Sequence, residues 1–407
     1  MVTGLVFYKV VFIAATFSAP SFWSIYGLIA TIFLVSRLPY AYLHKDEHEK
    51  IYPKNLYPNV SIIIPAKNEE AGILRTIETC INSIYEGQIE IIVIDDGSTD
   101  GTKNEVIKAQ GIYGQKVKLI AFEKNQGKRE AMAEGIARAL YEIIVFVDSD
   151  SFISPDSIHH IVQHFMAKEK VAAVSGNTKV ENISQNILTK MQSIKYAVSF
   201  DIYKASESVY SSVTCCPGCF SAYRKSIIAP LIPSWKNHSF LGSKSTFGDD
   251  RGLTNFVLRA GWDIVYCEKA QATTIVPHKF SVYWKQQLRW KKSWIREGIF
   301  ASTFMWKKRH PLASFAFYTT FSFPFLVIPL VFHMINQSLI AHNPIIMFAF
   351  LFGFLLLGMV FALFTRVYRG AYYWLYMPLI SLTFITMFIW QMPYALLTFK
   401  KTQWGTR

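Results

Sequence analysis

Long uncharged runs near both ends of the chain constrain its fold more than any other feature of the sequence. Val10 to Val35 contains 26 residues and no charged side chain, whereas a helix needs about 20 apolar residues to cross a bilayer. Pro20 is expected to kink this run or to separate a short first segment from the main span. Two further runs, Pro311 to Asn336 and Pro344 to Phe364, are joined by a short polar turn. We expect an antiparallel pair of membrane helices there, which argues against a fully soluble protein.

Basic residues near these runs predict their orientation, because cytosolic loops carry an excess of Lys and Arg. Such residues follow the first run and flank the helix pair: Arg37, Lys45, Lys50, Lys54, Lys307, Lys308, Arg309, Arg366 and Arg369. A third apolar stretch, Ala371 to Phe399, is interrupted by Pro378 and Pro393. A single crossing would place the basic tail outside, so we expect an interfacial or re-entrant segment or a tight hairpin. A plain third span is the alternative.

The composition of the chain limits which kinds of partner it can bind and which cellular compartment its central domain occupies. The chain has 42 Lys and Arg residues against 28 Asp and Glu residues, a formal net charge of +14. This surplus suits phosphate-bearing partners or an anionic membrane face. Nucleic acid is the rival partner, but no recognition-helix or aromatic–basic sheet pattern supports it. The five cysteines make a poor disulfide framework and indicate a reducing, cytosolic domain, and neither they nor the ten His residues show a zinc-binding spacing.

The middle of the chain alternates between strand-like and helix-like segments, which predicts an α/β domain with a mostly parallel sheet. Short apolar runs predict strands at Val60–Pro65, Ile89–Ile94, Val117–Phe122 and Ile143–Val147. Helices are expected at Asn68–Tyr85, with Ile73, Ile77, Ile81 and Ile84 on one face, at Val106–Gln110 and at Lys128–Leu140. Ligands of such sheets bind beyond the carboxyl ends of the strands. Three polar clusters follow strands in this way: Pro65 to Glu69, Asp95 to Ser98, and Asp148 to Asp150.

Two of the polar clusters are suited to a diphosphate. Asp148 and Asp150 are separated by one residue, so a turn can direct both carboxylates at one Mg²⁺ or Mn²⁺ ion that bridges diphosphate oxygens. Gln126-Gly127-Lys128-Arg129 begins a helix, where backbone N–H groups and two cations favour a phosphate. A solvated turn is the alternative for each cluster.

Two later clusters are suited to a sugar acceptor. Asp249 and Asp250 precede the expected helix Leu253–Arg259, where a carboxylate can accept a proton from a sugar hydroxyl. Ordinary helix capping is the alternative. Gln286-Gln287-Leu288-Arg289-Trp290 offers a flat ring for a sugar and a guanidinium for a phosphate. An amphipathic interfacial helix would also contain such residues.

In this order, the clusters resemble those of membrane-bound, processive family 2 glycosyltransferases, and hyaluronan synthases most of all. Chitin-oligosaccharide synthases, capsule polysaccharide synthases and, more distantly, cellulose synthases are similar. The resemblance covers residues 55 to 407 and rests on these stretches: Ile64–Glu69, Asp95–Asp100, Gly127–Met132, Asp148–Asp150, Gly248–Thr254, Gln286–Trp290 and Trp404–Arg407. Each stretch alone is a weak signal, but the ordered set with the membrane segments is specific.

The resemblance implies a GT-A-type domain that uses a UDP-sugar donor and Mg²⁺ or Mn²⁺. The residues that match the donor site are Pro65, Ala66, Lys67, Glu69, Asp95, Asp96, Lys128, Arg129, Asp148, Gln286, Arg289, Trp404 and Arg407. Asp148 and Asp150 would hold the metal. Asp250, with Asp249 beside it, matches the general base, and Arg289 would stabilise the leaving UDP. The residues that match the acceptor site are Trp290, Cys216, Gly218 and Cys219.

The activity implied by the resemblance is processive, inverting synthesis of a β-linked polysaccharide and its translocation across the membrane. Hyaluronan-like synthesis from UDP-GlcNAc and UDP-GlcA is the first expectation. Alternatives are a single-donor enzyme that makes poly-GlcNAc, chitin oligosaccharide or another capsule polymer, and a non-processive polyprenyl-phosphate glycosyltransferase. Cys216-Pro217-Gly218-Cys219 departs from the usual Cys-x-Gly-Pro order of hyaluronan synthases. This departure leaves the identity of the product open.

We therefore expect a multi-pass protein of the plasma membrane whose catalytic domain lies in the cytosol. Its partners would be UDP-sugars, the growing polysaccharide and the lipid bilayer. Because the sequence ends at Arg407, translocation would use fewer helices than longer hyaluronan synthases have, or a second copy in a homo-oligomer. The predicted parts are membrane segments (1–37), a GT-A domain (38–274), interfacial helices (275–310), a transmembrane pair (311–366), an interfacial or re-entrant segment (367–399) and a cytosolic tail that closes over the nucleotide (400–407).

Overall fold

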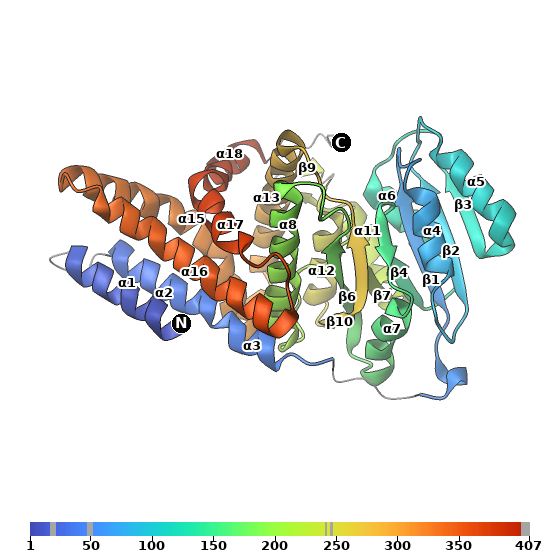
Figure 1. The fold of residues 1–407 in the computed structure, drawn as a ribbon. Coiled ribbons are helices and arrows are strands. Elements are labelled where there is room, and N and C mark those ends of the chain that lie inside the picture. The colour runs from blue at the N-terminus through green and yellow to red at the C-terminus, as the bar shows by residue number, and fades with distance from the viewer. Residues whose placement is uncertain (17–21, 47–51, 241, 245–246, 400–407) are drawn as a thin grey trace.

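A helical bundle and a sheet-containing domain lie at opposite ends of the molecule (Figure 1). The computed structural model describes residues 1–16, 22–46, 52–240, 242–244 and 247–399 of the chain. The bundle contains α1 (Val2–Thr16), α2 (Phe22–Val35), α15 (Pro311–Ile340) and α16 (Ile345–Arg369). The predicted combination of an α/β domain with membrane-type helices is confirmed.

The central sheet of the α/β domain has eight strands and is mixed. Their spatial order is β3 (Val117–Ala121), β2 (Ile89–Asp95), β1 (Val60–Ala66), β4 (Ile143–Phe146), β7 (Ser221–Arg224), β6 (Val171–Val180), β10 (Asp263–Thr274) and β5 (Ser151–Ile153). The first four strands are mutually parallel, and β6 is parallel to β10. Two strands run the other way, since β7 is antiparallel to β4 and β6, and β5 to β10. The carboxyl ends of β1, β2 and β4 therefore meet at one edge.

Both faces of the sheet are covered, which explains why β1 and β4 are mostly apolar runs rather than alternating patterns. Ile62 and Ile64 of β1 share one apolar core with α4 (Ile73–Ile81), α5 (Thr102–Tyr113) and α7 (Ser157–Ala167). Ile63 points to the opposite face and shares a second core with α6 (Lys128–Arg138) and α12 (Asp249–Arg259).

The first helix after β1 is shorter than the sequence pattern predicted. The pattern favoured Asn68–Tyr85, but α4 spans only Ile73–Ile81. Asn68 has a φ of 53°, a left-handed conformation that is incompatible with a helix start there. Ile84 lies beyond the helix and is 70% exposed, so it does not belong to the predicted apolar face.

Mostly short elements connect β6 to β10 and complete the domain. They are α8 (Ile187–Ala197), the π-helix η3 (Val198–Lys204), α9 (Ala205–Ser208), α10 (Lys225–Ile228), η4 (Ala229–Leu231), α11 (Ile232–Lys236), β8 (Ser239–Phe240) and β9 (Ser243–Lys244). Two 3₁₀ turns, η1 (Lys54–Leu56) and η2 (Gly114–Lys116), precede β1 and β3. The 23-residue α13 (Phe280–Ser302) and the short α14 (Met305–Lys308) then lead to the bundle.

Among the described residues, three helices are long and apolar enough to cross a membrane: Ile25–Leu43, Pro311–Ile340 and Ile345–Arg369. The first combines most of α2 with α3 (Arg37–Leu43). The run from Val10 to Val35 falls in two helices, since α1 ends at Thr16 and α2 begins at Phe22, in line with the expected separation of a short first segment from the main span. The candidate span extends past Arg37, whose guanidinium donates to the Ala316 carbonyl and to Thr320 Oγ1 of α15.

The last apolar stretch forms two helices with a bend between them. α17 (Tyr376–Thr386) is followed by η5 (Phe388–Trp390) and α18 (Gln391–Thr398), and the two halves meet at an angle of 42°. Together they are apolar enough for one broken span or one re-entrant loop. The predicted interfacial or re-entrant segment stays a prediction.

Candidate active site

The loops after β1 and β2 are tied together at the carboxyl edge of the sheet. The Asn68 N–H donates to Ser98 Oγ over 3.0 Å, and the Thr99 N–H donates to Asn68 Oδ1 over 2.8 Å. The left-handed conformation of Asn68 thus allows one residue to bridge two loops. The loops and strand ends joined in this way carry six predicted donor-site residues: Pro65, Ala66, Lys67, Glu69, Asp95 and Asp96.

Asp95 and Asp96 are buried and accept hydrogen bonds from the backbone of the surrounding loops. Asp95 Oδ1 accepts from the Ser98 N–H over 3.1 Å. The Asp96 carboxylate accepts from the N–H groups of Gln126 and Gly127 over 2.6 and 3.0 Å. Burial raises the pKa of Asp96, although these two donors act in the opposite direction. Two backbone donors of the predicted phosphate loop are therefore already engaged by Asp96.

Lys128 and Asp148 form an ion pair at the centre of this edge. Burial alone would lower the pKa of Lys128, but the carboxylates of Asp148 and Asp250 outweigh it and raise that pKa. Gly218 lies directly against the pair, because a Cβ atom there would sit 2.7 Å from Lys128 Nζ and 2.8 Å from Asp148 Oδ1. A larger residue at position 218 would therefore have to displace the ends of the Lys128 and Asp148 side chains.

The thiol of Cys219 lies close enough to three of the predicted carboxylates for their charges to affect its pKa. Burial raises its pKa, and Asp148, Asp150 and Asp250 raise it further, while Lys128 lowers it. Asp150 is buried at the edge of the sheet. The structure thus brings the Asp-x-Asp pair, the phosphate-loop lysine and the predicted base into one cluster.

Asp250 is held by its own helix and by a cysteine that the sequence analysis did not select. Its Oδ1 accepts from the Arg251 N–H over 2.8 Å, and the Cys215 thiol donates to its Oδ2 over 3.8 Å. The helix cap itself is Gly248, with a φ of 81°. Asp250 is therefore the second residue of the helix and not its N-cap, and its Oδ2, which faces Cys215, is directed toward the cluster.

Arg129 and Asp249 lie elsewhere, as a buried ion pair. Arg129 Nε is 2.8 Å from Asp249 Oδ1, and its NH1 donates to the Trp235 carbonyl over 3.1 Å. Consecutive helix residues point about 100° apart, so Arg129 cannot face Asp148 as Lys128 does, and Asp249 turns away from Asp250 in the same manner. Arg129 and Asp249 thus pair α6 with α12, and the predicted roles of Arg129 in diphosphate binding and of Asp249 in catalysis stay predictions.

The predicted acceptor helix, α13, packs against a lysine of α8. Lys195 donates to Gln287 Oε1, and its ammonium lies 5.6 Å from the centre of the Trp290 ring. Burial lowers the pKa of Lys195 to about 8. Trp290 is 40% exposed, which leaves part of its ring available to a ligand. Gln286 and Arg289 are half-buried on the same helix.

The side chain of Tyr196 on α8 lies near enough to the carboxylates of the site for their charges to affect it. Burial raises the pKa of Tyr196, and Cys219, Asp150 and Asp148 raise it further. Tyr196 follows Lys195 on α8, so this helix lies between the Asp-x-Asp pair and the helix of Trp290. The arrangement can hold a charged donor at the sheet edge and an acceptor against α13.

The donor set at this edge is compatible with a divalent cation. Asp148 and Asp150 supply carboxylate oxygens, which Mg²⁺ and Mn²⁺ prefer. Lys128 forms an ion pair with Asp148. A metal ion would compete with Lys128 for the Asp148 carboxylate, and a donor diphosphate would compete with Asp148 for the Lys128 ammonium. The residues present therefore fit the implied ion.

Comparison with known proteins assigns the family. Residues 61–231 match the family described as Glycosyl transferase family 2. The hyaluronan synthase of Streptococcus pyogenes is 31% identical over 391 residues, which cover 94% of this chain and 90% of that protein. The chain belongs to glycosyl transferase family 2. An N-acetylglucosaminyltransferase of Azorhizobium caulinodans is 34% identical over 250 residues, covering 60% of this chain and 62% of that protein.

A solved structure shows the same fold in another glycosyltransferase. The mannosyltransferase PcManGT from Pyrobaculum calidifontis, in complex with GDP-Man and Mn²⁺, superposes with a TM-score of 0.65. The match covers 98% of this chain and all of that one, at 17% identity. The predicted GT-A-type fold of this family 2 glycosyltransferase is therefore confirmed, and so is its assignment as an enzyme.

Cys216, Trp404 and Arg407 are the remaining predicted site residues. Cys216 was expected to bind the acceptor, but it is fully buried and its N–H donates to Thr254 Oγ1 over 3.0 Å. Its neighbour Cys215 donates to Asp250 of the site, and the acceptor role of Cys216 stays a prediction. Trp404 and Arg407, the predicted nucleotide-closing residues, lie outside the residues that the structure describes.

Three residues of the site were missed by sequence reasoning: Cys215, Lys195 and Tyr196. Cys215 directly precedes the Cys216-Pro217-Gly218-Cys219 stretch, and only the direction of its side chain was unknown. Lys195 and Tyr196 form no motif. A single lysine on a helix resembles any solvated residue, so the sequence contains no signal that would have identified it.

Proposed function

We propose that the protein is a processive, inverting glycosyltransferase that polymerises a β-linked polysaccharide from UDP-sugars and translocates it across the membrane. A hyaluronan-type product from UDP-GlcNAc and UDP-GlcA is the first candidate, supported by 31% identity to a hyaluronan synthase over 94% of the chain. The convergence of Lys128, Asp148, Asp150 and Asp250 around Cys219 carries the proposal. It supplies diphosphate binding and a base at one place.

The carboxylate of Asp250 would remove the proton from the acceptor hydroxyl. Its Oδ1 is fixed by the Arg251 N–H and its Oδ2 by the Cys215 thiol, so the group is oriented before the acceptor arrives. The acceptor oxygen then attacks the anomeric carbon from the face opposite to UDP. One bond forms as the bond to UDP breaks, which inverts the α-linked donor to a β-linked product.

The remaining residues would position the donor and stabilise the leaving group. Asp148 and Asp150 would hold Mg²⁺ or Mn²⁺, which supplies charge stabilisation to the departing diphosphate when bound. Lys128 and Arg289 would bind its oxygens, and Gln286 would lie beside Arg289 on α13. The loops of Pro65 to Glu69 and of Asp95 and Asp96 would receive the uridine, and Trp290 would stack on the acceptor sugar.

The proposed location is the plasma membrane, with the catalytic domain in the cytosol and the bundle as the route for the polymer. The three candidate spans support a membrane protein. Trp404 and Arg407 would close over the nucleotide from the same side.

The experiment is to incubate the purified protein in detergent with Mn²⁺ and single UDP-sugars, then pairs, and to measure UDP release and product size. We expect polymer only with UDP-GlcNAc and UDP-GlcA together, and a linkage-specific lyase would identify hyaluronan. Polymer from one donor would replace this product with a homopolymer, the second candidate, which the 34% identity to an N-acetylglucosaminyltransferase favours. UDP release with only a lipid-linked product would contradict processivity.

A further inference from the structure

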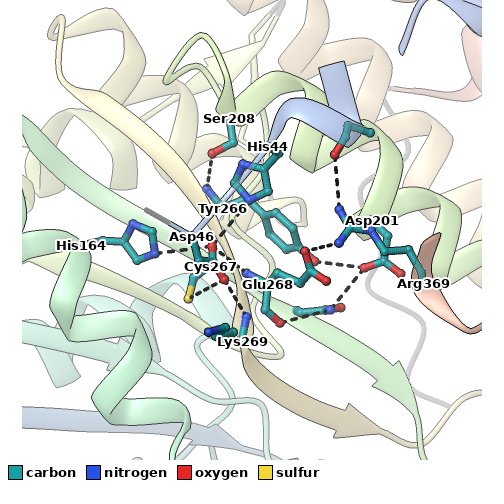
Figure 2. A network of polar contacts seen from close by, with 12 residues as sticks. His44, Asp46, His164, Asp201, Ser208, Tyr266, Cys267, Glu268, Lys269 and Arg369 are labelled. Atoms are coloured by element: carbon teal, nitrogen blue, oxygen red, sulfur yellow. Dashed lines mark hydrogen bonds and ion pairs between the residues drawn. The ribbon is translucent and has the colours of Figure 1, made fainter. Parts of the chain in front are cut away.

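A second cluster of metal-ligand side chains lies where the first candidate span joins the α/β domain. His44 and Asp46 follow α3, His164 is in the last turn of α7, and Cys267 is in β10. Figure 2 shows these four side chains directed toward one another. One donor atom from each of Asp46, His164 and Cys267 lies within 4.8 Å of the other two.

The distances between the donor atoms are close to those of a tetrahedral site. Zn²⁺ binds nitrogen, oxygen and sulfur at roughly 2.0–2.3 Å, which places tetrahedral ligands roughly 3.3–3.8 Å apart. Nε2 of His44 and Nε2 of His164 lie 3.5 and 3.8 Å from Asp46 Oδ1. Cys267 Sγ lies 3.9 Å from Asp46 Oδ2. Small side-chain rotations would bring all four donors to one ion.

His44 provides an independent indication of a missing ligand. Its side chain is only 6% exposed, and its Nε2 is buried without a hydrogen-bond partner. A buried polar atom without a hydrogen bond destabilises the fold, and this atom is directed into the cluster. A bound cation would satisfy it.

The carboxylate of Asp46 is already oriented as the ligand of a metal would be. The Glu268 and Lys269 N–H groups donate to its two oxygens over 3.2 and 3.0 Å. Metal-ligating carboxylates are held by hydrogen bonds of this kind. Two imidazoles, one thiolate and one carboxylate favour Zn²⁺ over the oxygen-seeking Mg²⁺ and Mn²⁺ of the candidate active site.

We propose that His44, Asp46, His164 and Cys267 bind one Zn²⁺ ion that fastens the first membrane span to the catalytic domain. The Cys267 thiol donates to Asp46 Oδ2. On binding, sulfur bonds to zinc as a thiolate and its proton leaves to solvent. Neighbouring contacts extend the attachment, since Arg369 at the end of α16 pairs with Glu268 and donates to the Ala41 carbonyl of α3 (Figure 2).

The test measures metal content in the full-length protein, purified in detergent without a histidine tag. We expect about one zinc per chain in the untreated protein, and background levels in Cys267→Ser and in His164→Gln. Cys80→Ser is the matched control, because Cys80 is also buried but lies on α4. Asp150→Asn separates this site from the proposed active-site ion and is expected to keep its zinc.

Replacement of zinc by Co²⁺ provides a second measurement that does not depend on the variants folding. We expect a sulfur-to-cobalt charge-transfer band and the intense visible bands of a four-coordinate site, together with a lower melting temperature after chelation. Zinc retained in Cys267→Ser, or a Co²⁺ spectrum without the sulfur band, would overturn the proposal. So would a wild-type protein that binds neither metal.

Discussion

Asp250 is the residue on which the proposed chemistry depends most directly. Its carboxylate faces Cys215 and the Lys128 cluster, and a neutral amide of the same shape cannot accept the acceptor proton. We predict that Asp250→Asn lowers turnover by roughly 10²–10⁴-fold, the usual contribution of a general base. UDP affinity should stay within a small factor of the wild type, as measured by calorimetry beside UDP release. Equal loss of turnover and of UDP binding would remove Asp250 from the base role.

A variant of the adjacent residue, Asp249, is the matched control for Asp250→Asn. Asp249→Ala leaves the buried Arg129 guanidinium without its partner, a change that typically costs about 3–5 kcal/mol of stability. We therefore predict a lower melting temperature in detergent as its main defect. If instead Asp249→Ala melted like the wild type and had lost turnover, the assignments of the two aspartates would have to be exchanged.

A pH prediction follows from Lys195. Burial lowers its pKa to about 8, so the cation over Trp290 is present below that pH and is lost above it. We predict that polymer synthesis falls as the pH rises through about 8, and that Lys195→Arg, which stays charged, removes this fall. Stability should change in the opposite direction. The unfolded lysine binds its proton up to its higher ordinary pKa, so stability increases with pH between the two values.

A fall in activity that persists in Lys195→Arg would assign the titration to another group. Lys190→Arg is the control on the same helix, because its ammonium lies over Tyr373 instead.

Adjacent residues limited what the sequence could predict at this scale. The motifs contain Lys128 with Arg129, Asp249 with Asp250, and Cys215 with Cys216. In each pair one side chain faces the site and the other is buried in the structure. Spacing identifies the pair, but only the position of the helix or loop on the sheet determines which member faces the ligand.

At the scale of elements, α13 connects the acceptor side of the site to the C-terminal helices. Lys291 of α13 donates to the Phe388 carbonyl and to Gln391 Oε1 over 2.6 and 2.8 Å, at the bend between α17 and α18. Ile295 packs with Met392 and Ala395 of α18. The helix that carries Trp290 thus also fixes the helix that leads into the C-terminal tail.

We predict that Lys291→Leu reduces polymer synthesis several-fold by releasing the bend, while membrane insertion and UDP release with short acceptors are largely retained. Product length on gels, compared with UDP released, is the measurement. Lys285→Leu is the control, since Lys285 is an exposed residue of the same helix. Unchanged product length in Lys291→Leu would mean that the bend does not influence the site.

The elements themselves were predicted unevenly, and burial explains the difference. Strands β1, β2, β3 and β4 were recognised because each is a short apolar run at a turn. β6 contains Ser175, Gly176 and Asn177, which are buried through hydrogen bonds and close packing rather than through apolar character. Polar strands of this kind, and the antiparallel β7 and β5, give no comparable periodic signal.

At the scale of the molecule, the basic residues that flank the bundle hold it to the catalytic domain. Arg309, just before α15, pairs with Asp263 of β10 over 3.3 Å and donates to the Trp262 carbonyl over 2.8 Å. Arg369, at the end of α16, pairs with Glu268. Both cytosolic ends predicted from charge therefore lie against the α/β domain, and α15 and α16 extend away from it (Figure 1).

This arrangement predicts the topology of the helix pair. With 30 and 25 residues, α15 and α16 are about 45 and 38 Å long, more than the roughly 30 Å of hydrocarbon. The turn at Ala341 should thus lie on the opposite side of the membrane from the catalytic domain.

In intact cells a membrane-impermeant maleimide should label Ala341→Cys, whereas Lys103→Cys, exposed on α5, should react only after permeabilisation. The wild type, with its native cysteines, provides the blank. Labelling of Lys103→Cys from outside would invert the topology, and labelling of Ala341→Cys only after permeabilisation would show that the pair does not cross.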